Sequence, residues 1–472
     1  MSALCAVPSP LPAVLRVRPG RARGPIPGDR TLFPVVRPNR LRRWRRVGAF
    51  ALVSLAAPLA AQPPVPPLAS GGTITLEQAL ALAFERSPQI QESAARVALA
   101  EGALVGARTY PYNPILEAEG ASRDDGNERT SDREIALSQE IEIAGQRGKR
   151  VAAASAAAEA ARSALTRSRQ ELAARVTSAF AAVLRAREIA ELAAFEREVA
   201  AELAAFEQRR LDAGAGTLID LNVTRAAEGR AARRVALAFA DEAAARASLA
   251  EVVALPVAEL PAAAGKLPDA WPAPAALAEL VPLALGQRSD LLALRSEVEA
   301  ATARIRLERS LATPNLVIGL ATGREADQED LDTVRAGLAI PLFQRNQGGI
   351  ATARAEEDVL TARLASAELA VRREVTAAWS RAEATARALA VFLQTVAGTL
   401  EENLDLVQRG LAAGKLRGSE VLVFRRELID SRRELIEAAG DAWLAQIELD
   451  LATGTTVVPP TSDPSSSAET TR

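Results

Sequence analysis

Two kinds of periodicity follow each other along the chain, and they predict long helices separated by pairs of short strands. Apolar residues recur at helical spacing over 76–108, 149–211, 219–253, 277–311, 350–411 and 420–451. Apolar and polar residues alternate instead over 115–122, 135–141, 316–322 and 334–340, the pattern of strands with one apolar face. We therefore predict a fold that is mainly α with a small β part.

The same order of elements occurs twice along the chain. Residues 75–255 and 277–452 each run through helix, strand, strand, long helix and final helix, and the Pro/Ala-rich segment 256–276 links them. Landmarks recur at a fixed spacing of 200 positions: Gly214 with Gly414, and Asp220 with Glu420. The sequence thus predicts two tandem repeats.

The long helical stretches cannot fold as compact units. The stretch 149–211 would be about 95 Å long at 1.5 Å per residue, so it must pack along its length against other helices. Its many alanines allow helices to approach closely. A cytosolic coiled coil would satisfy the same pattern, but the four short strands argue against it.

The strands carry apolar residues on one side and polar residues on the other. This alternation is typical of an outer-membrane β-barrel, although a sheet covering a soluble core would show it as well. Two hairpins cannot close a barrel, because small transmembrane barrels need about eight strands, so several chains would have to contribute. The predicted lipid-facing residues are Leu116, Ile135, Leu137, Leu316, Ile318, Leu320, Val334 and Leu338.

Tyr110 and Tyr112 lie where the first helical stretch gives way to the first strand. Tyrosine is enriched at membrane–water interfaces, so both are candidates for an interfacial belt. Packing against the nearby prolines would explain them equally well.

Composition excludes several kinds of chemistry. The chain has 472 residues, no histidine and a single cysteine, Cys5, so it has no histidine-based catalysis, no imidazole metal site and no internal disulfide. We predict neither an enzyme nor a bound cofactor. The acids Asp124, Asp125, Asp330 and Asp332 fall in predicted loops between strands, where a solvated surface explains them better than a metal or catalytic site.

The N-terminal segment 1–61 has the charge and pattern of an export signal. It holds eleven arginines and one acid, Asp29, which gives it a net charge of +10 and leaves −12 for the remainder of the chain. The uncharged apolar stretch 47–61 is shorter than the roughly 20 residues of a spanning helix, although a short signal anchor remains an alternative. Residues 62–74 would form a flexible linker and 453–472 a disordered tail.

At this point the sequence resembles the TolC-type outer-membrane efflux factors, most closely the CzcC-type subgroup that serves heavy-metal exporters. The resemblance covers residues 75–451 and rests on the order of the elements together with four local motifs. These are Leu76-Glu77-Gln78-Ala79-Leu80, Gln139-Glu140-Ile141-Glu142, Gly145-Gln146-Arg147-Gly148 and Pro341-Leu342-Phe343-Gln344-Arg345-Asn346-Gln347-Gly348.

The resemblance implies a homotrimer that forms a twelve-stranded outer-membrane barrel on a long periplasmic α-barrel. It implies a passive conduit for metal cations, drugs or other small molecules, served by a periplasmic adaptor and an inner-membrane pump of the RND type; nothing indicates nucleic acid. Asp220 and Glu420 match positions that line the periplasmic aperture. The turns that would meet the adaptor contain Gly214, Thr217, Gly414 and Ser419.

Two alternatives stay open at the level of sequence. Asp220 and Glu420 could simply be acids near helix N-termini, where the helix dipole stabilises negative charge. The whole chain could instead be a periplasmic coiled-coil structural or adaptor protein, which would lack strands with a lipid-facing side.

Overall fold

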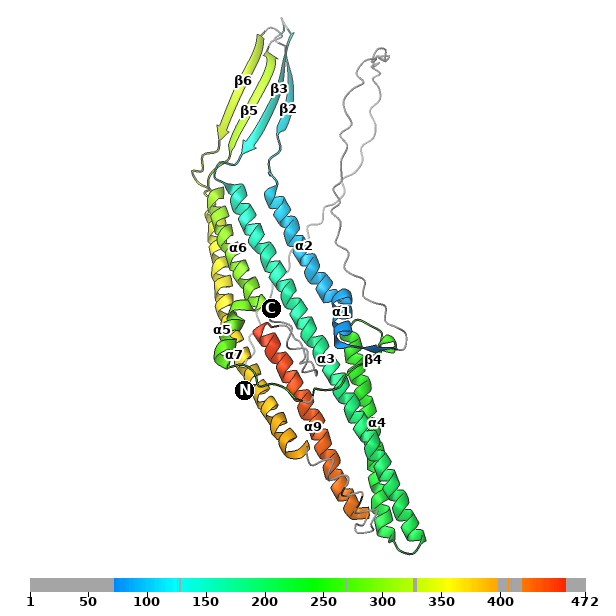
Figure 1. Cartoon of the computed structure of the whole chain (residues 1–472). Helices are drawn as coiled ribbons and strands as arrows, with labels where there is room; N and C mark the ends of the chain where they lie inside the picture. The colour runs from blue at the N-terminus through cyan, green and yellow to red at the C-terminus, as the bar shows by residue number, and fades with distance from the viewer. Residues whose placement is uncertain are drawn as a thin grey trace, which may run out of the picture. The chain divides into compact units, whose positions relative to one another are not determined.

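The computed structural model describes residues 72–124, 126, 129–268, 270–325, 329–397, 406, 409 and 418–455. Within this part the fold is mainly helical with a small sheet, as predicted (Figure 1). The predicted export signal at 1–61 and most of the predicted tail at 453–472 lie outside the described residues.

The first helical stretch of each half is broken into two helices, where the sequence predicted one. Helices α1 (Leu76–Arg86) and α2 (Pro88–Arg108) are separated at Ser87, which is extended because Pro88 disfavours a helical residue before it. Helices α5 (Leu277–Gln287) and α6 (Ser289–Leu311) are separated at Arg288, with φ −60° and ψ 125°. The guanidinium of Arg288 bonds to Glu374 and to the carbonyl of Ala452, which holds this residue outside the helix.

The long helices begin near the predicted positions. Helix α3 (Gln146–Asp212) has 67 residues, so it is about 100 Å long, and α7 (Gln347–Phe392) is followed by a π-helix, Leu393–Ala397. Both start after a residue with left-handed backbone, Gly145 (φ 69°) and Asn346 (φ 57°). The rest of the predicted stretch 350–411 lies almost wholly outside the described residues.

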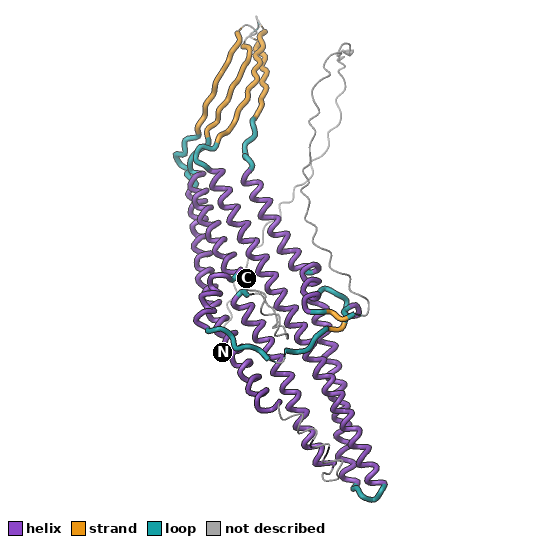
Figure 2. The backbone as a smooth tube through the Cα atoms, viewed as in Figure 1, coloured by secondary structure: helices purple, strands orange, loops and turns teal. Residues whose placement is uncertain are grey.

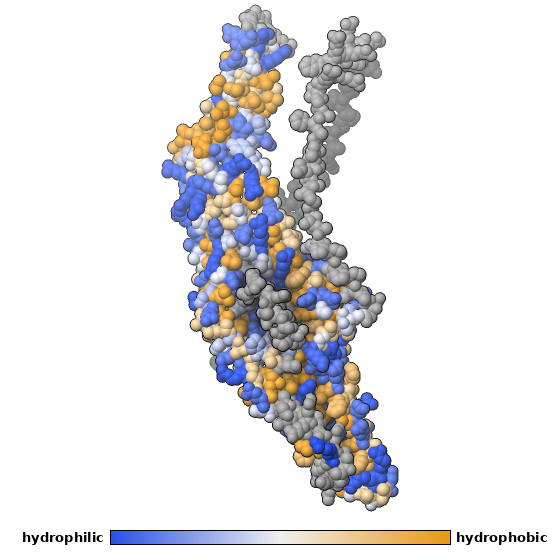
Figure 3. Space-filling view, viewed as in Figure 1, coloured by the Kyte–Doolittle hydropathy of each residue, from blue (hydrophilic) through white to orange (hydrophobic). Residues whose placement is uncertain are grey.

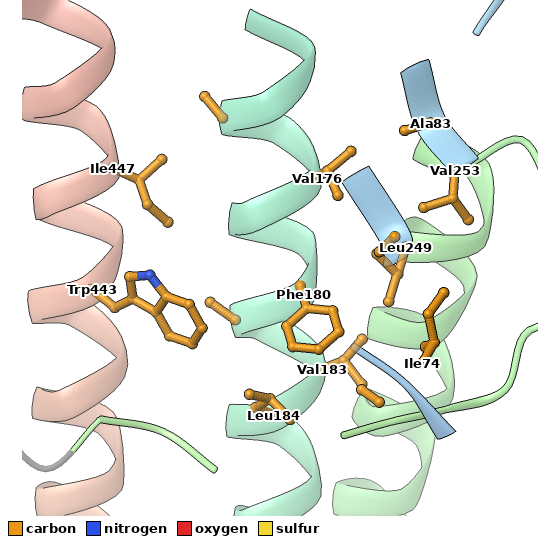
Figure 4. Packing of buried hydrophobic residues seen from close by; sticks show 14 of the residues in the cluster. Ile74, Ala83, Val176, Phe180, Val183, Leu184, Leu249, Val253, Trp443 and Ile447 are labelled. Carbon is orange, nitrogen blue, oxygen red and sulfur yellow. The ribbon is translucent and has the colours of Figure 1, made fainter. Parts of the chain in front are cut away.

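Helix α3 is the centre of the packing. It contacts α2, α4 (Leu218–Val252), α6 and α9 (Gly418–Thr453), while α7 packs on α6 and α9. Figure 4 shows Phe180 and Leu184 of α3 between Leu249 of α4 and Trp443 of α9. Further along α3, the contact with α4 is made by alanines: Ala190, Ala193 and Ala238. The alanine bias therefore serves close helix packing.

The segments expected as linkers are partly ordered against this core. Thr73–Ile74 forms β1, parallel to β4 (Ala262–Ala263), and the Ile74 side chain is fully buried, so these two residues are not a flexible linker. Burial of an isoleucine in the core explains the order. Thr453, expected in the disordered tail, is buried as the last residue of α9.

Four strands form one antiparallel sheet in the order β2-β3-β5-β6 (Figure 2). The strands are β2 (Ile115–Asp124), β3 (Arg129–Ile141), β5 (Leu316–Glu325) and β6 (Glu329–Leu338). β2 and β3 form one hairpin, β5 and β6 another, and the β3–β5 pairing joins them. The sheet is therefore built from both halves of the chain.

Candidate functional site

The strand register places all eight predicted lipid-facing residues on one side of the sheet, which we call the apolar face. Residues directly opposite in an antiparallel pair point to the same side. Leu116 lies opposite Leu137, Leu137 opposite Leu320, and Leu320 opposite Val334, so one row crosses all four strands. The other members stand two or four positions from this row on the same side: Ile135, Leu316, Ile318 and Leu338.

The apolar face is exposed in the single chain. Val334 is 76% exposed, Leu116 71% and Leu320 58%. In a soluble protein such a continuous surface of large apolar side chains marks contact with a partner or a membrane. Figure 3 shows hydrophobic surface over the sheet and its junction with the helices.

The opposite side of the sheet, the polar face, carries charged residues. Glu119 lies opposite Glu134, Glu117 stands two positions from Glu119, and Arg335 donates to Glu134 across the sheet at 2.6 Å. Three glutamates and one arginine therefore lie on the side of the sheet opposite the apolar face.

The two outer strands of the four-stranded sheet, β2 and β6, have open edges. Among the described residues, β2 pairs only with β3, and β6 pairs only with β5. An open strand edge exposes unpaired backbone N–H and C=O groups, which another chain can bind.

The two predicted interfacial tyrosines are held at the junction of α2 and the sheet. The Tyr110 hydroxyl donates to the Glu140 carbonyl at 2.8 Å and accepts from the Glu142 amide at 3.1 Å. The Tyr112 hydroxyl accepts from Asn315 at 2.9 Å, and burial together with the charge of Glu140 raises the pKa of Tyr112. These bonds fix both rings at the junction, and their place in a membrane interface stays a prediction.

The turn between α3 and α4 has the geometry that its glycines predict. Gly214 has φ 74°, and its amide donates to the Leu211 carbonyl at 2.9 Å. A Cβ atom on Gly216 would lie 2.9 Å from the Leu211 nitrogen, so this position has no room for a side chain. Arg210 donates to the Ala215 carbonyl at 3.0 Å and closes the turn.

Thr217 and Asp220 form a reciprocal cap at the start of α4. The Thr217 hydroxyl oxygen accepts from the Asp220 amide at 3.1 Å and donates to the Asp220 carboxylate at 2.8 Å. The structural role foreseen for Asp220, an acid in the first turn of a helix, is therefore present. A role at an aperture stays a prediction.

The corresponding turn of the second half precedes α9, which begins at Gly418. Gly414 lies outside the described residues. The backbone of Ser419 and Glu420 lies in the first turn of α9.

The acids predicted in loops between strands lie within strands instead, because both hairpins extend further than their alternation predicted: Asp124 is the last residue of β2, and Asp330 and Asp332 belong to β6. All three are exposed. Asp124 accepts from the Gly126 amide at 3.0 Å, and Asp330 accepts from Arg324 at 3.0 Å, while Asp125 lies outside the described residues. Within the described ranges, no three Asp, Glu or Cys side chains gather as metal ligands would. A search of the same ranges finds no helix with the length and apolar character to cross a membrane.

Sequence reasoning missed an apolar group at the junction of β6 and α7. Ile340, Leu342 and Phe343 are 74%, 65% and 91% exposed. Ile340 stood at the end of the predicted strand 334–340, whereas β6 ends at Leu338. Leu342 and Phe343 were noted only within a family motif, although three large apolar residues around Pro341 could have signalled a surface feature.

With this geometry in hand, comparison with known proteins identifies the class: the chain belongs to the outer membrane efflux protein family, whose model matches residues 79–254 and 280–455. The resemblance inferred from the sequence is thereby confirmed. The chain is an outer-membrane efflux channel protein, and its family is a transport family rather than an enzyme family. The family assignment favours the channel over a periplasmic coiled-coil protein.

Individual proteins that are similar to the chain support this family assignment. The cobalt-zinc-cadmium resistance protein CzcC of Cupriavidus metallidurans is 27% identical over 392 residues, which cover 83% of this chain and 92% of that protein. The outer membrane protein VceC from Vibrio cholerae matches with a TM-score of 0.64 at 18% identity, covering 81% of this chain and 97% of VceC. The open state of the Neisseria gonorrhoeae MtrE outer membrane channel has a TM-score of 0.65 at 17% identity, covering 81% and 89%.

Proposed function

We propose that three copies of the chain form one passive conduit, in which each copy contributes four strands to a twelve-stranded barrel. The open edges of β2 and β6 support this, because each can pair with the other edge strand of a neighbouring copy. The two-sided sheet also supports it, since a water-filled barrel needs lipid outside and polar side chains inside. The apolar face then contacts outer-membrane lipid, and the helices form an α-barrel that extends into the periplasm.

The observation that carries this proposal is the row Leu116, Leu137, Leu320 and Val334, which crosses both hairpins on one face. A four-stranded sheet with an exposed apolar row is unstable in water and too small to close alone. Closure by three copies removes both problems at once.

The turn between α3 and α4, with its counterpart at 413–420, forms the periplasmic end of the conduit in this proposal. Gly214, Thr217, Gly414 and Ser419 meet the tip of a periplasmic adaptor. Threefold symmetry repeats Asp220 and Glu420 as rings of carboxylates, which favour cations in a pore. An inner-membrane pump of the RND type delivers the substrate.

Metal cations are the substrate class that we propose. The relative CzcC is named for resistance to cobalt, zinc and cadmium, and acidic rings suit the passage of cations. A conduit should not hold its cargo tightly, so a channel without imidazole ligands is compatible with metal export. Deleting the gene should increase growth inhibition by these metals, and re-expression should restore tolerance. If the deletion leaves metal tolerance unchanged and increases sensitivity to drugs, the exported substrates are drugs and not metals.

The aperture is tested by conductance in planar bilayers. Asp220→Asn combined with Glu420→Gln keeps the side-chain volumes and removes the charge, so cation selectivity should fall. Thr217→Val is the matched control, because it removes the cap of α4 and keeps the charge of both carboxylates. Unchanged cation selectivity in the double variant would show that neither acid lines the aperture.

The division of the chain follows from the same proposal. Residues 1–61 direct export and are removed, 75–255 and 277–452 are the two repeats, and 256–276 joins them. Peptide sequencing of the mature N-terminus tests the first of these assignments.

A further inference from the structure

Ile340, Leu342 and Phe343, which we call the junction patch, have no packing role in the described structure that would explain their size. They lie between the last residue of β6, Leu338, and the first residue of α7, Gln347. Phe343 is 91% exposed, more than any other large apolar residue among those described. A phenylalanine in this setting needs a partner of apolar character.

The junction patch continues the apolar face towards the helices. Val334 and Leu338 belong to that face, and Ile340 follows Leu338 after two positions. The patch therefore adjoins the surface that meets lipid, at its boundary with the helices. Tyr110 lies at the same junction between helices and sheet, just before the opposite edge strand β2. Its hydroxyl donates to the Glu140 carbonyl near the end of β3.

Arginines without acid partners lie at the same level. The Arg147 Nε donates to the Arg108 carbonyl at 2.9 Å, and the Arg345 Nε donates to the Pro341 carbonyl at 3.2 Å. Both side chains are exposed, and across the described ranges neither forms an ion pair. Each guanidinium is thus anchored through Nε while its terminal amino groups have no carboxylate to bind.

Other arginines of the described helices are paired with acids, and one of them, Arg150 in the first turn of α3, lies at the junction itself, 2.6 Å from Glu142. Arg162 bonds to Glu101 of α2 at 2.7 Å, and Arg304 lies 3.2 Å from Glu356 of α7. At the junction, fixed cations stand beside exposed apolar side chains, and a surface that offers both is complementary to a phospholipid, with its anionic headgroup and its acyl chains.

We propose that the junction patch inserts into the periplasmic leaflet of the outer membrane while Arg147 and Arg345 bind anionic phospholipid headgroups. The proposal rests on the outer-membrane location of the family, and it assigns a lipid site to residues outside the strands. It explains why Phe343 is exposed and why two anchored guanidinium groups lack acids. Contact with a second copy of the chain is the competing explanation, and the experiment separates the two.

Insertion is measured by tryptophan quenching in the purified full channel, reconstituted in vesicles of lipids brominated near the acyl carbonyls. Phe343→Trp places the probe at the patch. Leu369→Trp is the matched control, because Leu369 is 69% exposed on α7 but lies about 33 Å further along that helix. Phe343→Trp should be quenched and Leu369→Trp should not. Equal quenching of the two would overturn insertion, and protection of Phe343→Trp from both lipid and water would assign the patch to a second copy.

Headgroup binding is measured with the same probe. A minor fraction of brominated phosphatidylglycerol in unbrominated phosphatidylcholine should quench Phe343→Trp more than the same fraction of brominated phosphatidylcholine. Arg147→Gln with Arg345→Gln should lower this preference by about fivefold per arginine. Arg197→Gln with Arg233→Gln removes two exposed arginines from α3 and α4 and should leave the preference unchanged. No preference for phosphatidylglycerol in the Phe343→Trp channel would overturn the headgroup site.

A conductance measurement separates the lipid site from the conduit. Conductance is recorded from the same preparations. Normal conductance without quenching contradicts the lipid site alone, whereas quenching without conductance contradicts the conduit and leaves the lipid site standing.

Discussion

Leu137 of β3 and Leu320 of β5 lie directly opposite each other in the antiparallel sheet. The two residues come from different hairpins, which more than a hundred residues of helix separate along the chain. Their pairing aligns both hairpins in one register, so the apolar side chains of all four strands share a face. A shift of one residue between the hairpins would place the apolar side chains of one hairpin on the polar side of the other.

A charge on the apolar face should prevent insertion, whereas a charge on the polar face should be tolerated. We compare Val334→Arg with Thr333→Arg, since the two residues are neighbours in β6 and point to opposite sides. Arginine facing the middle of a bilayer costs about 2–4 kcal/mol per chain. The yield of assembled channel in outer-membrane fractions should fall for Val334→Arg only. Equal yields would mean that this face does not meet lipid.

Arg288 should be a major contributor to stability where α5 meets α6. Its side chain is 4% exposed and bonds to Glu374 at 2.7 Å, Asp290 at 2.7 Å and the Ala452 carbonyl at 3.1 Å. Arg288→Met should lower the free energy of unfolding by about 3 kcal/mol, because it leaves these acceptors without a donor. Urea unfolding followed by circular dichroism measures this.

The matched control for Arg288 is an exposed ion pair. Arg381 and Glu448 are 2.6 Å apart, with side chains that are 64% and 52% exposed. Arg381→Met should cost less than about 1 kcal/mol, because solvent screens such pairs. Similar losses for the two variants would show that burial of Arg288 does not matter.

Ala254 adopts a backbone conformation that suits glycine. Its φ is 54°, and the residue 200 positions later, Gly454, has φ 79°. Ala254→Gly should therefore raise the free energy of unfolding by about 0.5–1 kcal/mol. Gly454→Ala should lower it, since the added Cβ would also lie 3.2 Å from the Arg288 Cγ. Thermal unfolding of both variants measures these changes. A lower free energy of unfolding for Ala254→Gly would contradict backbone strain at Ala254.

Asp450 should make the channel more stable in mild acid. Burial raises the pKa of Asp450 to about 6 from an ordinary value of 3.8, although Gln446 donates to its carboxylate. Between these two pKa values the Asp450 carboxyl is protonated in the folded state and ionised in the unfolded state. The free energy of unfolding therefore rises as the pH falls from about 6 to about 4. Asp450→Asn should remove this rise and add about 1 kcal/mol of stability at pH 8. The same pH dependence in wild type and Asp450→Asn would contradict this origin; Asp441→Asn, an exposed acid of the same helix, is the control.

The periodicity of the sequence predicted the helices and strands because their side chains pack along regular faces. Helix α3 begins and ends within three residues of the predicted stretch 149–211, and each described strand overlaps its prediction. The breaks at Ser87 and Arg288 were missed. Arg288 is held by Glu374 and Ala452, which are distant in sequence, and no local pattern encodes such contacts.

The candidate site was only partly visible in the sequence. Alternation placed the apolar residues on one side of each strand, but the β3–β5 register joins distant segments and needed the structure. The cap between Thr217 and Asp220 follows from local rules for helix starts. Leu342 and Phe343 of the junction patch were missed because they lie in an irregular segment, which carries no periodicity, and Ile340 was assigned to a strand that ends at Leu338.

Electron cryomicroscopy of the channel in lipid nanodiscs tests the central claim most directly. The account predicts a threefold ring of twelve strands, in which β6 of each copy is hydrogen-bonded to β2 of the next and the row Leu116, Leu137, Leu320 and Val334 faces lipid. A monomer, or a ring in which β2 and β6 stay unpaired or the row faces the lumen, would contradict it.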